Sequence, residues 1–107
     1  MDISDLFKQA KAMQEKAAEI QAGLARVEVE GQAGGGLVRV TLSGKAELKR
    51  IALDPSLMKP EEREIVEDLI VAAHADAKAK AEAKMAEEMR ALAGGLGLPP
   101  GFGLPGM

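Results

Sequence analysis

The centre of this 107-residue chain reads VEVEGQAGGGLVRVTLSGK over residues 27–45. Valine and leucine alternate with charged or polar residues on both sides of a triple glycine at 34–36, which predicts two antiparallel strands joined by a tight turn. A second turn is expected at Gly44-Lys45, with glycine in the first central position that a type II′ turn prefers. The segment therefore predicts a β-hairpin that continues into a third strand.

That third strand is expected over roughly residues 46–53, although its apolar side chains do not keep one parity. Leu48 has one parity, whereas Ile51 and Leu53 have the other. One extra residue near Lys49-Arg50, in a β-bulge, would return all three side chains to the same face. The sequence thus predicts a small antiparallel sheet of three strands.

Two long helical patterns flank this sheet. Over residues 3–24, apolar side chains recur at spacings of three and four, which is typical of a helix that lies against another helix. A second helix is expected from about Pro60, which suits a first turn, to about Ala93, before two glycines. The alanines in the middle of its apolar line predict close approach of another helix. That line comprises Val66, Ile70, Ala73, Ala77, Ala81, Met85, Met89 and Leu92.

The length of the second helix predicts a molecule that is not a compact monomer. At 1.5 Å per residue the helix would be about 50 Å long, whereas a globule of this chain length has a radius of gyration of about 13 Å. Three short strands cannot cover both helical stripes, and exposed stripes would form a larger apolar patch than monomers usually carry. We therefore expect an α+β fold with an α-β-β-β-α subunit, assembled as a homodimer with projecting helical arms. Residues 1–93 would form its single domain, and the Gly- and Pro-rich residues 94–107 a flexible tail.

Composition argues against several classes of protein. The chain contains no cysteine, which excludes disulfides and thiolate metal sites, and its single histidine, His74, cannot build a zinc site by itself. No apolar run approaches the ~20 residues that span a bilayer, and the first residues lack the basic and apolar regions of a secretory signal. A cytoplasmic protein without membrane or metal partners is therefore expected.

The glycine-rich motifs do not indicate a nucleotide site. Residues 101–106 match the pattern G-x-G-x-x-G, but only one residue follows them, so the helix that a dinucleotide fingerprint requires is missing. The triple glycine at 34–36 lacks the Lys-Ser or Lys-Thr of a P-loop. The carboxylates follow helix electrostatics, and none forms a pair in contrasting environments as acid–base catalysis needs. We expect no enzymatic activity, no catalytic residue, no small-molecule substrate and no cofactor.

The balance of charge leaves two interpretations of the basic residues open. The net charge is −3, from 14 basic and 17 acidic side chains, which is not the signature of a strong nucleic-acid binder. Lysines nevertheless gather on both helices. They either form a phosphate-binding surface or belong to solvated helical faces, where acids four residues away pair with them. The expected pairs are Asp76–Lys80, Lys78–Glu82 and Lys84–Glu88.

Several short motifs follow one another in a recognisable order. They are Glu28-Val29-Glu30-Gly31, Gly35-Gly36-Leu37-Val38-Arg39-Val40, Ser43-Gly44-Lys45, Ile51-Ala52-Leu53-Asp54-Pro55, Glu67-Asp68-Leu69-Ile70-Val71-Ala72-Ala73, Asp76-Ala77, Gly94-Gly95-Leu96 and Leu98-Pro99-Pro100-Gly101. Together with the order of elements, they resemble the YbaB/EbfC family of small bacterial nucleoid-associated proteins over roughly residues 3–106. The resemblance implies a homodimer in which the two sheets come together and the helices extend like the arms of tweezers. It also implies binding to double-stranded DNA in the nucleoid.

Carried onto this sequence, the resemblance gives six candidate DNA-binding residues: Lys8, Lys11 and Lys16 in the first helix and Lys78, Lys80 and Lys84 in the last. Lysine–phosphate contacts would give an affinity that falls with salt and carries little sequence information. The alternative function is a protein-interaction module, in which the groove between the helical arms holds a partner helix. The acidic balance of the chain favours this alternative.

Overall fold

The computed structural model describes residues 2–95, and its elements confirm the expected α-β-β-β-α order of an α+β fold. They are α1 (Ile3–Arg26), β1 (Glu28–Ala33), β2 (Val38–Ser43), β3 (Leu48–Leu53), the 3₁₀ turns η1 (Pro55–Leu57) and η2 (Pro60–Glu62), and α2 (Arg63–Gly95). The division into a domain of residues 1–93 and a tail stays a prediction, because residues 96–107 lie outside the described part of the chain.

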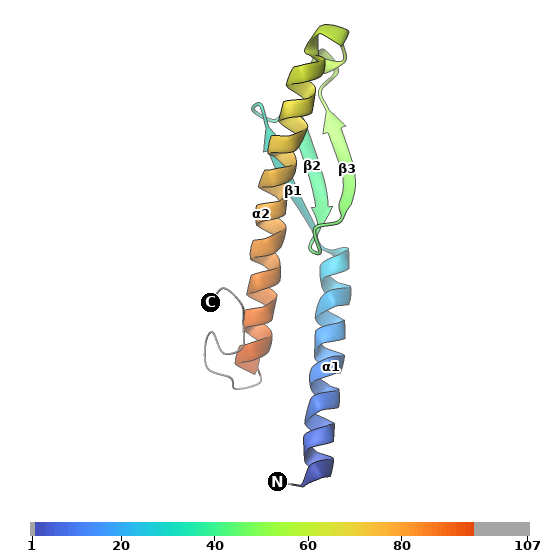
Figure 1. The fold of residues 1–107 in the computed structure, drawn as a ribbon, viewed down its shortest axis with the longest axis vertical. Coiled ribbons are helices and arrows are strands. Elements are labelled where there is room, and N and C mark those ends of the chain that lie inside the picture. Colours follow the sequence, from blue (N-terminus) through green and yellow to red (C-terminus); the bar gives the residue numbers. More distant parts are fainter. Residues whose placement is uncertain (1, 96–107) are drawn as a thin grey trace.

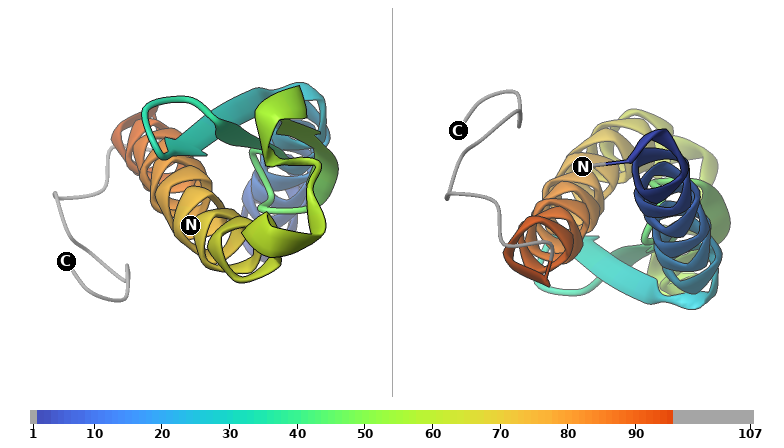
Figure 2. Two further views of the ribbon diagram at one scale, coloured as in Figure 1. Left: turned by 90° about the horizontal axis from the view of Figure 1, so that it is seen from above. Right: turned by 90° about the horizontal axis from the view of Figure 1, so that it is seen from below.

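The molecule is an elongated rod. Its principal extents are 69 × 23 × 15 Å and its radius of gyration is 19.2 Å, against about 13 Å for a compact chain of similar length. In Figure 1, α2 covers the sheet with its first half and continues past it, while α1 leaves the same end of the sheet in the same general direction. Seen from below in Figure 2, α1 and the end of α2 stand apart as two columns. The expectation of helices that project beyond the sheet is confirmed.

The sheet has the strand order β1-β2-β3, and both pairings are antiparallel. Thr41 pairs with Arg50 and Leu42 pairs with Leu48, so Lys49 is the extra residue of a bulge. This bulge was expected from the parity of the apolar residues. It brings Leu48, Ile51 and Leu53 opposite the apolar residues of β2, so that all of them share one face of the sheet.

The turn between β2 and β3 differs from the expected type II′ turn. The residue with positive φ is Ala46 (φ 65°), and Gly44 does not have a positive φ. The buried hydroxyl of Ser43 accepts hydrogen bonds from the N–H groups of Lys45 (3.1 Å) and Glu47 (3.2 Å), which shapes the turn. Gly44 is required for a different reason, since a Cβ there would lie 2.7 Å from the carbonyl oxygen of Leu24.

The core lies between the sheet and the first half of α2. Val38, Val40 and Leu42 of β2 are fully buried, and so are Ala73 and Ala77 of α2. The alanines were expected to admit another helix, and this expectation is wrong. They allow the close approach of strand β1 instead. The residue of β1 that pairs with Val40 is Gly31, and because glycine has no side chain, the backbone of α2 can lie directly against the strand.

The N-terminal half of the apolar stripe of α1 is uncovered within the described residues, whereas its C-terminal end lies beside α2. Leu24, near the sheet, is the one buried residue of α1. Ile3, Leu6, Phe7 and Met13 are all exposed. The expected packing of the exposed half of this stripe against another helix stays a prediction, because it was made for a homodimer and the structure describes a single chain.

Candidate nucleic-acid interface

Three of the six candidate lysines lie on the projecting half of α1. Lys8, Lys11 and Lys16 are exposed, and within residues 2–95 none of them takes part in an ion pair or a side-chain hydrogen bond. With 3.6 residues per turn, Lys8 lies on the side of the helix opposite Leu6. These three ammonium groups are therefore exposed to solvent without a close ion pair, although Asp5, Glu15 and Glu19 lie three or four residues from them on α1.

The three lysines of α2 do not form a common patch with them. Lys80 Nζ donates to the carbonyl oxygen of Glu30 at 2.8 Å and lies 3.3 Å from Asp76 Oδ2. Lys84 Nζ lies 3.3 Å from Glu88 Oε1, so two of the expected pairs form. Lys78 forms no ion pair in the described part of the chain, and the expected pair with Glu82 is absent there. Among the α2 candidates, only Lys78 is exposed and unengaged.

Asp76 and Lys80 together close the outer edge of β1. Asp76 Oδ2 accepts a hydrogen bond from the N–H of Gln32 at 3.0 Å, and Lys80 bonds the nearby Glu30 carbonyl. These two strand groups have no ladder partner on that side, so the helix supplies one. The i,i+4 spacing on α2 predicted the Asp76–Lys80 pair, but it carried no sign of the strand, which is more than 40 residues away in sequence.

Removal of the Asp76 carboxylate should destabilise the fold above pH 4. The N–H of Gln32 and then the ammonium of Lys80 hold the pKa of Asp76 below its usual value. Because the pKa is lower in the folded state, the resulting stability is present above the unfolded pKa and is lost as pH falls through the folded one. We expect Asp76→Ala to lower the melting temperature at pH 7, and the difference from the parent chain to shrink below pH 4. Asp68→Ala, at an exposed α2 position without such bonds, is the control; equal losses in both variants would contradict the edge role.

The arginines of the sheet are paired, unlike the α1 lysines. Arg50 makes two hydrogen bonds to the carboxylate of Glu28, at 2.6 and 3.2 Å, and Arg39 lies 3.6 Å from Glu30. The hydrogen bond from Arg50 lowers the pKa of Glu28. This outer face of the sheet is therefore close to neutral and offers little attraction to phosphate.

The acidic excess of the chain is concentrated at one end of the rod. Residues 59–68 carry five carboxylates and two cations, an excess equal to the whole net charge of −3. This segment lies at the start of α2, at the end of the molecule opposite the N-terminus of α1 (Figure 1). The carboxylates are Glu61, Glu62, Glu64, Glu67 and Asp68 and the cations are Lys59 and Arg63. The negative net charge therefore does not lie on the arm that carries the free lysines.

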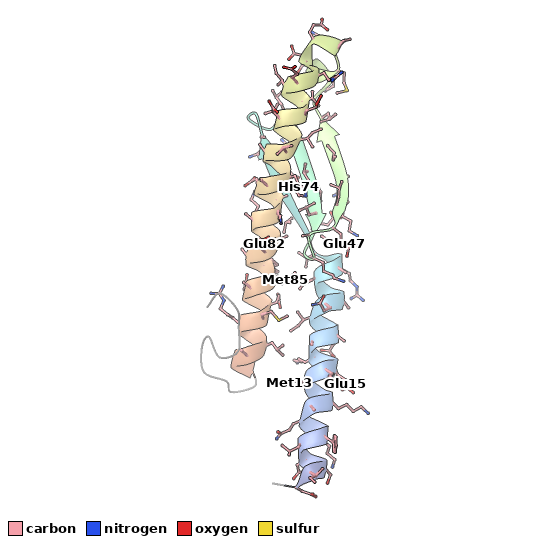
Figure 3. All side chains as sticks on the ribbon, in the orientation of Figure 1. Met13, Glu15, Glu47, His74, Glu82 and Met85 are labelled. Atoms are coloured by element: carbon pink, nitrogen blue, oxygen red, sulfur yellow. The ribbon has the colours of Figure 1, made fainter. Side chains whose placement is uncertain are left out.

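An exposed apolar surface lies where β3 meets α2, and we call it the β3–α2 patch. A shallow depression there is lined by Leu48, Ile51, Ile70, Val71 and His74 over the buried Val40. Val71 is 70% exposed and Leu48 is 56% exposed. Figure 3 labels His74 on the face of α2 beside the sheet. Within residues 2–95, no strand pairs with the outer edge of β3, whereas α2 closes the edge of β1.

A groove runs between α1 and α2 near the sheet. It is lined by Glu19, Ile20, Gly23, Leu24 and Val27 on one side and by Lys84 and Glu88 on the other. No helix among residues 2–95 is long and apolar enough to cross a bilayer. In the same range, no three acidic or histidine side chains gather as metal ligands would.

Comparison with known proteins gives a consistent set of similarities. The model of the YbaB/EbfC DNA-binding family matches residues 1–96. A nucleoid-associated protein of Rhodopseudomonas palustris (strain TIE-1) is 57% identical over 103 residues, 96% of this chain and 97% of that protein. A nucleoid-associated protein of Bradyrhizobium sp. (strain ORS 278) is 58% identical over 102 residues, 95% and 96% of the two chains. The crystal structure of an uncharacterized Helicobacter pylori protein is similar with a TM-score of 0.72 at 25% identity, covering 90% of this chain and 97% of that one.

Proposed function

This chain belongs to the YbaB/EbfC DNA-binding family, and on that premise we propose that it binds double-stranded DNA in the nucleoid as a homodimer. The curated relatives bear the name nucleoid-associated protein, which supports this location within the cytoplasm. The contacts are made mainly between lysine side chains and backbone phosphates. Such contacts position a protein on the duplex without reading its sequence, so little sequence preference is expected.

The observation that carries the proposal is the α1 arm with its unpaired lysines. Lys8, Lys11 and Lys16 stand on a helix that projects from the body of the protein, far from the acidic end at residues 59–68. Release of counterions from the duplex favours binding only when the protein cations are not already neutralised. Lys78 is the α2 lysine that meets this condition, whereas Lys80 and Lys84 are engaged with Glu30, Asp76 and Glu88. We therefore propose that Lys80 and Lys84 contribute less than the other four.

The β3–α2 patch supports the homodimer. It combines exposed Leu48, Ile51 and Val71 with an unpaired strand edge, two features that monomeric proteins usually avoid. A second copy that presents the same patch would cover both, as a two-fold interface requires. The arms of the two subunits would then project from a shared body.

Reversal of charge on the arm tests the DNA contacts. We expect the triple variant Lys8→Glu, Lys11→Glu, Lys16→Glu to bind a random duplex at least about tenfold more weakly at low salt than the parent chain. The slope of log affinity against log salt should become shallower by about 0.9 for each phosphate contact that is lost. Gel shifts or fluorescence anisotropy over a salt series measure both quantities.

The matched control reverses three lysines outside the α1 arm, Lys45→Glu, Lys49→Glu and Lys59→Glu, with the same change in net charge. Its affinity should fall much less. Equal losses in the two variants would mean that net charge, and not the arm, governs binding. If the parent chain gives no shift at high micromolar concentration, the DNA-binding proposal itself is wrong. A partner that is retained after nuclease treatment would favour the protein-interaction alternative, for which the groove between α1 and α2 offers a place.

Sedimentation equilibrium tests the homodimer. We expect the parent chain to have the mass of a dimer at micromolar concentration, and Val71→Lys to shift it to the monomer by placing a charge in the apolar interface. Val71 is mostly exposed in the single chain, so the helical content of the variant should stay unchanged. Ala72→Lys, at an exposed neighbouring position turned away from His74, should remain dimeric. A monomeric parent chain would contradict the dimer, and a dimeric Val71→Lys variant would contradict this location of the interface.

A further inference from the structure

The first three turns of α1 carry an apolar stripe that the described part of the chain leaves bare. Ile3 is 67% exposed, Leu6 51%, Phe7 72% and Met13 43%. Figure 1 shows these turns extending past the end of α2, and Figure 3 shows Met13 on the side of α1 that faces α2. The stripe therefore borders the space beyond the last residue of α2.

A covering partner would stabilise the N-terminal half of α1, a helix of 24 residues. Most helical stability in proteins comes from packing of an apolar face. Every residue from Ile3 to Met13 is exposed in the described structure. The segment thus gains little from tertiary packing until something lies on its stripe.

The chain itself supplies an apolar segment that starts near this place. Twelve residues, 96–107, follow the end of α2, and none of them is charged. In an extended, proline-type conformation they span about 37 Å at 3.1 Å per residue, whereas the stripe from Ile3 to Met13 is about 15 Å long. The tail is therefore long enough to reach and follow the stripe. Its large apolar side chains are Leu96, Leu98, Phe102, Leu104 and Met107.

The prolines of this segment reduce the entropic cost of docking. Pro99, Pro100 and Pro105 restrict the backbone before binding, so less conformational freedom is lost. Proline-type extended segments also dock on aromatic side chains without needing internal hydrogen bonds, and α1 offers the exposed ring of Phe7.

We propose that residues 96–107 dock on the α1 stripe of Ile3, Leu6, Phe7 and Met13 in the same chain. The tail shields this stripe from water and stabilises the projecting half of the arm. Lys8 lies on the side of the helix opposite Leu6, so the docked tail leaves this proposed phosphate contact open. Lys11 lies one turn after Phe7, at the border of the stripe. The proposal does not depend on DNA binding and is tested without DNA.

A spin label in the tail tests this contact. The chain has no cysteine, so Gly103→Cys gives a single attachment site for a nitroxide. We expect the amide NMR signals of residues 3–13 to lose intensity when the label is paramagnetic and to recover when it is reduced. Removal of residues 96–107 should speed hydrogen exchange of the same amides.

Two further variants show whether apolar contact is the cause. With Leu98→Ser, Phe102→Ser and Leu104→Ser, the signal loss in α1 should disappear. With Gly97→Ser, Gly101→Ser and Gly106→Ser, which change as many tail residues but keep the apolar side chains, the signal loss should remain.

The location of the signal loss decides between the possible occupants of the stripe. A second copy is tested by refolding a mixture of isotope-labelled chains without a nitroxide and unlabelled chains with one. Signal loss in α1 of the isotope-labelled chains of that mixture would mean that the tail docks on the partner, because those chains carry no nitroxide of their own. Signal loss confined to the β3–α2 patch, or none beyond the end of α2, would also overturn the proposal. None of these outcomes bears on the DNA-binding proposal.

Discussion

Gly31→Ala is expected to destabilise the fold by on the order of 3 kcal/mol, which lowers the melting temperature by about 15 °C at a fixed protein concentration. A Cβ at this position would lie 2.8 Å from Ala77 Cα, and still closer to the backbone nitrogen of Ala77 and the carbonyl oxygen of Ala73. Both neighbours are backbone atoms of α2, so no side chain can rotate away. The strand and the helix must separate to admit one methyl group.

Gly23→Ala is the control for this prediction. Gly23 lies within α1, and a Cβ there meets nothing within 4 Å. Because alanine is a better helix former than glycine, the control should be neutral or more stable by up to about 1 kcal/mol. Thermal unfolding followed by circular dichroism measures both variants. A melting temperature of Gly31→Ala within a few degrees of the parent chain would show that β1 and α2 are not in this close contact.

Ala77→Lys changes the same contact between β1 and α2 and is expected to destabilise the fold by about 4 kcal/mol or more, because it combines overpacking with an unpaired buried charge. Ala77 is fully buried, and so are Ala73 and Ala81 one turn away on either side. The lysine stem therefore has no short path along the helix by which its ammonium could reach water. Since small domains are stable by only about 5–15 kcal/mol, a large fraction of the variant should be unfolded or have an undocked sheet at 37 °C.

Ala79→Lys provides the comparison. Ala79 is exposed on the same helix and should accept lysine with little change in melting temperature. Ala73→Lys should behave like Ala77→Lys, since both alanines pack on the sheet. An unchanged melting temperature of Ala77→Lys would show that this alanine does not belong to the core.

The position of Gly31 also explains why the sequence misidentified the partner of the alanines. The alternation Val29, Gly31, Ala33 is visible in the sequence, but glycine in a strand is equally compatible with a bulge or a weak strand. Only the fold brings Gly31 against Ala73 and Ala77. A row of alanines on a helix indicates close approach of some backbone, and does not by itself say whether that backbone is a helix or a strand.

The role of the six candidate lysines in DNA binding stays a prediction, and the structure adds which of them are engaged within residues 2–95. Lys8, Lys11 and Lys16 are exposed there and take part in no ion pair. From the sequence, Lys78, Lys80 and Lys84 were equal candidates, whereas in the structure Lys80 donates a hydrogen bond to the edge of β1 and Lys84 forms an ion pair with Glu88. The backbone oxygen that Lys80 bonds belongs to Glu30, 50 residues earlier, and no local pattern carries that information.

The sequence by itself determined the order of helices and strands, a bulge near Lys49-Arg50, the elongated shape and the family. Each of these follows from short-range spacing of apolar, glycine and proline residues, or from motifs that survive in order along the chain. The tertiary structure alone decided how β1 packs against α2, which edge of the sheet α2 closes, and which of the candidate lysines form no ion pair within residues 2–95. Those outcomes depend on contacts between residues far apart in sequence, where a missing methyl group or a single carboxylate decides how closely two backbones meet.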